Sequence, residues 1–342
     1  MTKAETSVPV LEISQLTVML PTRKGTLTVL DNVSLSVGPG EIVGVVGESG
    51  AGKSMTGTAV IGLLPDQIHI QSGEILFNGK AIENLDAEQM RRIRGREIGT
   101  IFQDPMASLN PLLTVGDQIV ETMLTHLDIS KKEAWQRGID LLTRVGISDP
   151  GQRMRGFPHQ FSGGMRQRIV IALALCTNPK LVIADEPTTA LDVSVQSQIL
   201  GLLKSISAEH ETSVILITHD MGVIAEMADK VVVMYAGRVA ESGPVQATLE
   251  APQHPYTKGL MGSIPRLGAK QHRLQQISGN MPRLGQVDSN SCSFAARCPD
   301  AFGLCKEQHP PAFNVDATLV HCWLYAPKDD HKMASGEGVQ RE

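Results

Sequence analysis

The sequence is organised around the stretch Gly47-Glu48-Ser49-Gly50-Ala51-Gly52-Lys53-Ser54. The apolar run 41–46 before it is typical of a buried strand, and residues 55–61 after it can continue as a helix. A strand, a glycine-rich loop and a helix in this order form the setting of a phosphate-binding loop. Glycines let consecutive backbone N–H groups turn inward around phosphates, and the helix N-terminus adds partial positive charge. The stretch therefore predicts a nucleoside triphosphate site.

Side chains of this phosphate loop add to the predicted phosphate contacts. Lys53 carries a full positive charge, and the hydroxyl of Ser54 can ligate Mg²⁺. The other residues predicted to contact the nucleotide here are Gly47, Ser49, Gly50, Ala51, Gly52 and Met55.

The overall composition is that of an ordinary globular protein. The chain has 342 residues, of which 42% are hydrophobic and 20% charged, which is enough for one large core and a second, small domain. Its net charge of −5 gives no electrostatic reason to propose nucleic acid as a partner. No apolar run approaches the ~18 residues of a membrane span, and the first residues lack a signal-peptide profile. The expected compartment is the cytoplasm.

Hydrophobic periodicity predicts an α/β fold with a mixed, largely parallel sheet. Alternation across residues 10–37 indicates antiparallel strands at the N-terminus. Apolar spacing near 3.6 residues across 115–146 indicates helices, which we place in a helical subdomain at about 105–178. The apolar runs 181–184 and 214–217 each stop on polar residues, as strands of parallel sheets do at a binding edge.

The composition also predicts the division of the chain. Residues 10–245 carry the alternating strands and helices of the first domain. Residues 246–330 are rich in proline and cysteine and form a C-terminal region, and the polar tail 331–342 is expected to be disordered.

Acidic and polar residues at the strand ends are candidates for catalysis. Asp185 and Glu186 end a strand that we expect beside the strand of the phosphate loop; Asp185 would hold Mg²⁺, directly or through water, and Glu186 would polarise the attacking water. His219, at another strand end, could donate to the γ-phosphate, although a lone histidine is as often structural. Residues 162–164, Ser-Gly-Gly, precede a predicted helix and offer either a second anion site or a simple helix cap.

Taken together, these motifs resemble the nucleotide-binding subunit of an ABC transporter. The resemblance is carried by the phosphate loop, Gln103, residues 161–167, the two adjacent acids, residues 190–192 and His219, and it covers about residues 10–245. It implies ATP and Mg²⁺ as ligands and two ATPase subunits facing head to tail.

The resemblance implies a role for each matching residue. Gln103 would sense Mg²⁺ and the γ-phosphate, Asp192 would lie in the loop that crosses the dimer interface, and His219 would be the switch histidine. Ser162, Gly163 and Gly164 would contact ATP held by the partner subunit. The implied catalytic residues are Glu186, His219 and Gln103, and the implied Mg²⁺ ligands are Ser54, Gln103 and Asp185. Two departures are Phe161 and Met165 in the signature and the absence of an aromatic residue for adenine stacking in 17–20.

A narrower resemblance points to the dipeptide/oligopeptide importer subgroup. Residues 101–111, 254–257 and 297–299 are similar to that subgroup. It implies ATP-driven import of di- or oligopeptides by a peripheral subunit on the cytoplasmic face of the inner membrane. Its partners would be a homologous second ATPase, two permease subunits and an extracytoplasmic substrate-binding protein, with no nucleic acid. The alternatives are an importer of nickel or another small solute and, less expected, a nucleic-acid-associated ABC ATPase.

Four cysteines, Cys292, Cys298, Cys305 and Cys322, lie in the C-terminal region, where a reducing compartment argues against disulfides. No Cys-x-x-Cys pair is present, so the spacing leaves unrelated thiols, a zinc site and an iron–sulfur site open. The subgroup resemblance implies that these cysteines ligate a [4Fe–4S] cluster, with Zn²⁺ as the alternative. Such a cluster would serve as a staple for a region with little core. The fifth cysteine, Cys176, is predicted to be a core residue.

Overall fold

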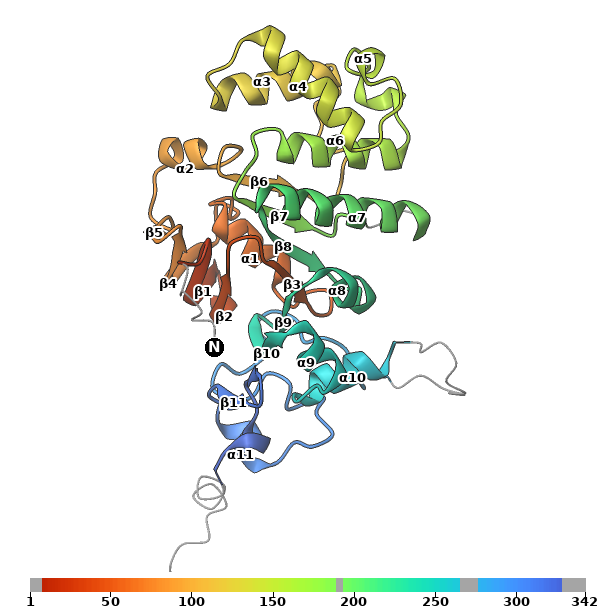
Figure 1. The fold of residues 1–342 in the computed structure, drawn as a ribbon. Coiled ribbons are helices and arrows are strands. Elements are labelled where there is room, and N and C mark those ends of the chain that lie inside the picture. The colour runs from red at the N-terminus through yellow and green to blue at the C-terminus, as the bar shows by residue number, and fades with distance from the viewer. Residues whose placement is uncertain (1–7, 189–192, 265–275, 328–342) are drawn as a thin grey trace, which may run out of the picture.

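The computed structural model describes residues 8–188, 193–264 and 276–327, and these form two sheets with helices on both faces of the larger one (Figure 1). The strands are β1 (Leu11–Thr22), β2 (Gly25–Val37), β3 (Ile42–Val46), β4 (His69–Phe77), β5 (Lys80–Ala81), β6 (Ile98–Ile101), β7 (Leu181–Asp185), β8 (Ser213–Thr218), β9 (Lys230–Tyr235), β10 (Arg238–Pro244), β11 (Phe313–Val315) and β12 (Thr318–Val320). The helices are α1 (Lys53–Val60), α2 (Ala87–Ile93), α3 (Val115–His126), α4 (Lys131–Arg144), α5 (Pro150–Arg153), α6 (Gly163–Leu175), α7 (Val193–His210), α8 (Met221–Met227), α9 (Val245–Glu250), α10 (Pro255–Gly262) and α11 (Gly303–Glu307).

The strand order confirms the predicted mixed sheet. The main sheet runs β11-β12-β10-β9-β3-β8-β7-β6, with parallel pairing from β9 to β6 and antiparallel pairing elsewhere. The smaller sheet, β2-β1-β4-β5, is antiparallel, as the N-terminal alternation predicts.

One neighbour in the sheet differs from the prediction. Strand β7, which ends in Asp185, does not lie beside β3, because β8 pairs with both and lies between them. An uninterrupted apolar run indicates burial on both faces of a sheet but carries no information about which strand lies next to it. The prediction of adjacent strands is therefore wrong.

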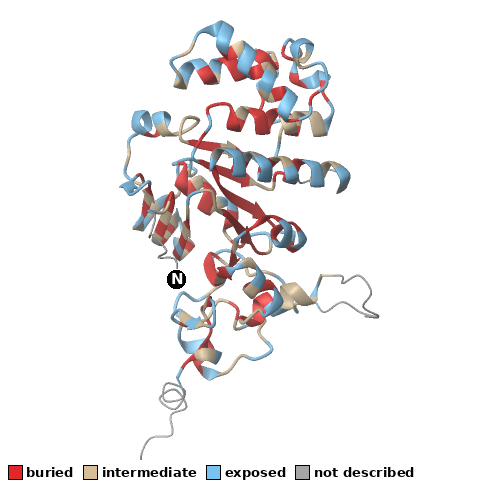
Figure 2. Cartoon of the chain, in the orientation of Figure 1, coloured by how far each residue is buried: buried red, intermediate tan, exposed pale blue. Residues whose placement is uncertain are grey.

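Alternating side chains of the main sheet face two separate cores. In β7, Val182 and Ala184 pack in the core that includes the apolar side chains of α6. Leu181 and Ile183, on the other face, pack in the core that includes α1 and the small sheet. Helices α1 and α6 therefore cover opposite faces of the main sheet, and Figure 2 shows its strands as mostly buried.

The helices α3, α4 and α5 lie beyond α6, at the top of Figure 1. Side chains of Thr114 and Ser130 accept hydrogen bonds from the first turns of α3 and α4, which is the usual N-cap arrangement. Their apolar faces, including Ile119, Met123 and Leu142, are buried in the same core as α6.

The C-terminal segment joins the main sheet rather than folding apart from it. Strand β12 pairs with β10 through Glu241↔Val320, and β11 completes the edge. Tyr235, Tyr256 and Phe294 form an aromatic cluster where this segment meets β9 and α10. Among the helices that the structure describes, none combines the length and the apolar character of a membrane span.

Candidate active site

The phosphate loop follows β3 directly and is held in a tight turn. Gly47 has φ 152°, and a Cβ there would lie 2.2 Å from the backbone oxygen of Met234 on the neighbouring strand β9. The backbone of Ala51 is fixed on both sides, because its N–H donates to Glu48 O (3.1 Å) and its oxygen accepts from Gly237 N (2.9 Å). A side chain at position 47 would clash with this strand, so the backbone requires the glycine that the phosphate-loop motif places there.

Lys53, the first residue of α1, folds back over this loop. Its ammonium donates to the backbone oxygens of Gly47 (2.8 Å) and Glu48 (3.1 Å), and the residue is 6% exposed. Burial lowers the pKa of Lys53, while the nearby carboxylates of Glu186 and Asp185 act in the opposite direction. The lysine is thus a buried cation at the loop, where it can meet a phosphate.

Ser54 and Asp185 form a pair suited to a hard cation. The Ser54 hydroxyl donates to Asp185 Oδ1 at 3.1 Å, although β3, which leads into α1, and β7 are separated by β8. Burial raises the pKa of Asp185, and the hydrogen bond from Ser54 opposes that shift. A hydroxyl and a carboxylate at this distance are ligands that Mg²⁺ accepts in nucleotide sites.

Glu186 lies at the centre of a cluster of side chains from three successive strand ends. Its Oε2 accepts from Gln103 Nε2 at 3.2 Å, and its Oε1 lies 3.1 Å from His219 Nδ1. The backbone of Glu186 has φ 47°, a left-handed conformation held by the hydrogen bond from its N–H to Ile217 O (2.8 Å). Strained backbone of this kind is typical of functional positions, where the surrounding structure fixes the side chain.

The signature residues lie at the start of α6. The Ser162 hydroxyl accepts from Met165 N (3.4 Å), so within one chain this serine acts as a helix cap. A Cβ on Gly163 would meet nothing within 4 Å, whereas one on Gly164 would lie 3.2 Å from Val195. Because α6 and α1 cover opposite faces of the sheet, the structure does not bring the signature to the phosphate loop of the same chain. Asp192 lies outside the described residues.

Two features beside the loop were missed by the sequence analysis. The first is an ion pair between Glu48 and Arg297 of the C-terminal region. The second is a cavity of about 580 Å³ that adjoins Ser49 and Gly50 and is walled by residues 26–29 and 281–285. The similarity of residues 297–299 to the dipeptide/oligopeptide importer subgroup singled out this segment. The sequence alone did not indicate which residue Arg297 contacts.

The prediction of a metal cluster at the four C-terminal cysteines is wrong. In the part of the chain that the structure describes, no three His, Cys, Asp or Glu side chains are arranged to hold a metal ion. Burial raises the pKa of Cys298 to about 11 and that of Cys322 to about 12, which favours protonated thiols over the thiolates that metals bind.

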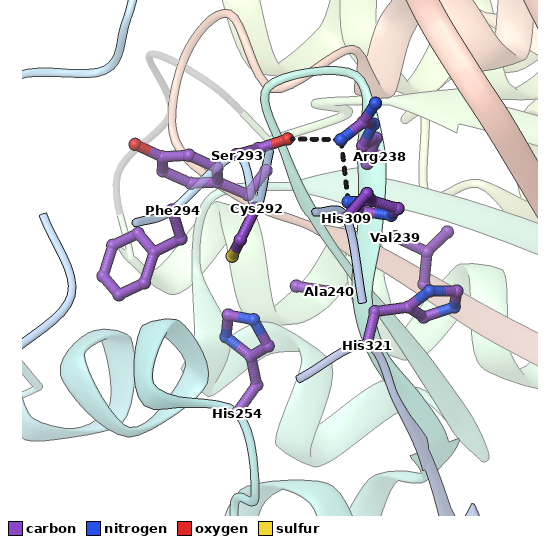
Figure 3. A pocket seen from close by; sticks show the side chains of 10 residues that line it. Arg238, Val239, Ala240, His254, Cys292, Ser293, Phe294, His309 and His321 are labelled. Carbon is purple, nitrogen blue, oxygen red and sulfur yellow. Dashed lines mark hydrogen bonds between the residues drawn. The ribbon is translucent and has the colours of Figure 1, made fainter. Parts of the chain in front are cut away.

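All five cysteines are free, and those of the C-terminal region pack as small apolar side chains. Cys305 is buried with Leu304 and Trp323, and Cys292 packs against them. Cys292 also borders a cavity of about 20 Å³ with three histidines (Figure 3), a space no larger than about one water molecule. Cys176 is a core residue as predicted, 6% exposed.

Comparison with known proteins places both parts of the chain in one family. Residues 30–189 match the family described as ABC transporter, and residues 240–305 match the family described as oligopeptide/dipeptide transporter, C-terminal region. The chain is 48% identical over 330 residues to the dipeptide transport ATP-binding protein DppD of Bacillus subtilis (strain 168), covering 96% of this chain and 98% of the relative.

Two further comparisons agree. The chain is 44% identical over 300 residues to the oligopeptide transport ATP-binding protein OppD of Salmonella typhimurium, covering 88% and 89% of the two chains. The solved dimer of the ATP-binding cassette MJ0796, in a post-hydrolysis state bound to ADP and Pi, covers 69% of this chain and 98% of its own, with TM-score 0.63 and 28% identity. The phosphate loop, the strand-end carboxylates and these similarities lead to one conclusion: the chain belongs to the ABC transporter family, among the ATP-binding proteins of dipeptide and oligopeptide transport.

Proposed function

We propose that this chain is the ATP-binding and ATP-hydrolysing subunit that powers ABC-type import of di- or oligopeptides. The observation that carries the proposal is the cluster of Gln103 and His219 around Glu186, placed at the same sheet edge as the Ser54–Asp185 pair. The parallel strands β6, β7 and β8 end together there, as binding edges of such sheets do. Peptide transport is the part supported by the named relatives.

Each residue of this edge has a task in phosphoryl transfer to water. The ammonium of Lys53 and the N–H groups of the phosphate loop would bind the β- and γ-phosphates. Ser54, Asp185 and Gln103 would hold Mg²⁺, which neutralises phosphate charge when bound. Glu186 would orient and polarise the attacking water, and His219 would donate to the γ-phosphate.

The ATP site is proposed to be completed by a second ATPase subunit. Because α6 and the phosphate loop lie on opposite faces of the sheet, Ser162, Gly163 and Gly164 would contact ATP held by that partner, with Asp192 in the loop between the subunits. The dimer of the similar cassette MJ0796 supports this arrangement, and we propose a homologous but distinct partner chain.

We place the complete assembly at the cytoplasmic face of the inner membrane. Its other members would be two permease subunits and an extracytoplasmic substrate-binding protein, as a peptide transport system requires. Within this chain, residues 10–245 would form the ATPase domain, with a helical subdomain at about 105–178, and residues 246–330 the C-terminal region. The proposed disordered tail, 331–342, lies outside the described residues.

The test uses the reconstituted transporter in proteoliposomes. Lys53→Ala should abolish ATP binding and peptide-stimulated phosphate release, because it removes the cation at the loop, while Lys24→Ala, on an exposed hairpin turn, should leave both unchanged. Stimulation by nickel in place of di- or oligopeptides would contradict the proposed cargo. ATP binding by the Lys53→Ala protein at wild-type strength would contradict the proposed site.

A further inference from the structure

The C-terminal region reaches the phosphate loop through a buried guanidinium. Arg297 Nη1 lies 2.9 Å from Glu48 Oε1 and 3.2 Å from Oε2, and Nη2 lies 3.2 Å from Oε2. The two residues are 249 positions apart in sequence. The side chain of Arg297 is 7% exposed and that of Glu48 is 30% exposed. A guanidinium that binds both oxygens of a carboxylate fixes the direction of that carboxylate as well as its charge.

Arg297 is itself held by several contacts from the protein. Its Nε donates to Ser278 O (2.9 Å) and its Nη2 to Gly279 O (3.3 Å). Its Nη1 also donates to the Tyr235 hydroxyl (3.3 Å), and the guanidinium lies 5.7 Å from the centre of the Tyr235 ring. The guanidinium therefore approaches Glu48 from a fixed position, set by β9 and by the segment before Met281.

The backbone of Glu48 is held from the same side. Its N–H donates to the hydroxyl of Tyr256 at 2.9 Å, and Tyr256, in α10, is 0% exposed. Burial raises the pKa of Tyr256, so the hydroxyl stays neutral and remains an acceptor for this N–H. The side chain and the N–H of one residue of the phosphate loop are thus both bound by residues beyond 245.

The charge of Glu48 explains why such a contact matters. ATP brings several negative charges to the loop, and a carboxylate one residue after Gly47 would repel them if it were unpaired. The bidentate contact with Arg297 neutralises the carboxylate and turns it toward the C-terminal region. Lys53 Nζ, 3.1 Å from Glu48 O, is then left to meet the phosphates.

We propose that Arg297 is a positioning residue of the ATP site. It holds Glu48, and through it the phosphate loop, in the conformation that accepts a triphosphate, and it balances the negative charge of Glu48. This inference rests on the proposed function above. It gives the C-terminal region a part in nucleotide binding that acts through Glu48.

The experiment measures ATP affinity and steady-state kinetics of the assembled transporter for four variants. Arg297→Met should weaken ATP binding about tenfold at low salt, with a smaller loss at high salt, because an exposed part of the Glu48 charge is screened. KM should rise more than kcat falls, since the Glu186 cluster is untouched. Arg297→Lys should give an intermediate loss, because an ammonium keeps the charge but not the bidentate geometry. Adding Glu48→Gln to Arg297→Met should restore affinity to within about threefold of wild type, because it removes the unpaired charge.

Lys306→Met, an exposed cation in α11 of the same region, is the matched control and should bind ATP normally. Equal weakening in Arg297→Met and in the double variant would overturn the proposal, because a merely structural arginine is not rescued by removing the charge of Glu48. Wild-type affinity in Arg297→Met would also overturn it. With Lys53→Ala inactive in the same assay, that second result would leave the proposed function standing.

Discussion

Different kinds of interaction stabilise the ATPase core and the C-terminal region. The core is built from apolar side chains that alternate between the two faces of one sheet, so its stability is spread over many similar contacts. The C-terminal region has a small apolar cluster around Leu304 and Trp323 and depends on a few buried polar side chains. The difference teaches that a segment with little periodic apolar surface can still be fixed firmly, provided that its polar groups find specific partners.

Arg238, the first residue of β10, is the clearest of these polar side chains. It is 8% exposed and pairs with Asp31 of β2, with Nε 2.9 Å from Oδ2. On its other side Nη1 donates to Ser291 O (3.0 Å) and to His309 Nδ1 (2.7 Å), as Figure 3 shows for the histidine. It also donates to Ser289 O and Ser293 Oγ. One side chain thus joins the small sheet, the main sheet and the C-terminal region.

The largest expected effect is on the rate of ATP hydrolysis and comes from a substitution in the ATPase core. Glu186→Gln should lower the rate of ATP hydrolysis about a thousandfold, roughly 4 kcal/mol of barrier, because the amide cannot polarise water, while ATP binding is kept. Phosphate release and retained ATP in the assembled transporter measure the two quantities. Glu88→Gln, on exposed α2, is the control. Normal turnover in Glu186→Gln would remove this residue from its role.

Breaking the Arg238 contacts between the two regions should have a somewhat smaller effect, which falls on the free energy of unfolding. Arg238→Met leaves the half-buried carboxylate of Asp31 and the partner carbonyls unpaired, so we expect a loss of about 3 kcal/mol in the free energy of unfolding. Urea denaturation of the chain measures this loss, and limited proteolysis locates it to residues 276–327. Arg91→Met, at an exposed ion pair, should leave the stability nearly unchanged. Equal stability of the two variants would show that the Arg238 contacts do not hold the region.

Acid should act on the C-terminal region before the core. Burial lowers the pKa of His254 to about 3 and that of His309 to about 4, so both stay neutral in the folded protein as the pH falls through 6 and 5. The unfolded chain binds protons at these histidines below about pH 6.5. Their contribution to the free energy of unfolding is therefore complete above that pH and is lost below it, by roughly 2 kcal/mol for each histidine at pH 5.

The pH prediction is measured by urea denaturation at pH 7.5 and pH 5. His309→Gln should reduce the difference between the two pH values, because glutamine can still accept from Arg238 but does not titrate. His69→Gln, at an exposed histidine of β4, is the matched control and should leave the difference unchanged. A pH dependence unaffected by His309→Gln would assign the acid sensitivity to other groups.

The smallest expected effect has the opposite sign. A Cβ on Gly201, in α7, would meet nothing within 4 Å, so Gly201→Ala should stabilise the core by about 0.5–1 kcal/mol through helix propensity and lower chain entropy in the unfolded state. A calorimetric scan then shows whether the two regions unfold together. If the whole transition shifts, they form one cooperative unit; if only part of it shifts, the C-terminal region unfolds separately. A loss of stability would contradict the prediction.

Much of the core could be predicted from the sequence because its signals are local. The glycine-rich loop at Lys53 and the apolar runs before Asp185 and His219 can each be recognised from a few neighbouring residues. The structure places the side chains of Ser54, Asp185 and His219 at one sheet edge. The helical periodicity of 115–146 likewise became α3 and α4. The neighbour of β7 could not be predicted, because apolar runs of similar length do not encode pairing order.

The C-terminal region shows what only the tertiary structure decided. Its cysteines suggested a metal cluster by resemblance, whereas the structure shows them as buried or half-buried free thiols. Arg297 and Glu48, or Arg238 and Asp31, meet across more than 200 residues, and nothing near either partner in the sequence indicates the other. The sequence by itself determined the phosphate loop and the alternating strands, because backbone sterics and hydrophobic period act locally. The folded chain decided which charges pair, because burial in a low dielectric depends on every segment that packs around them.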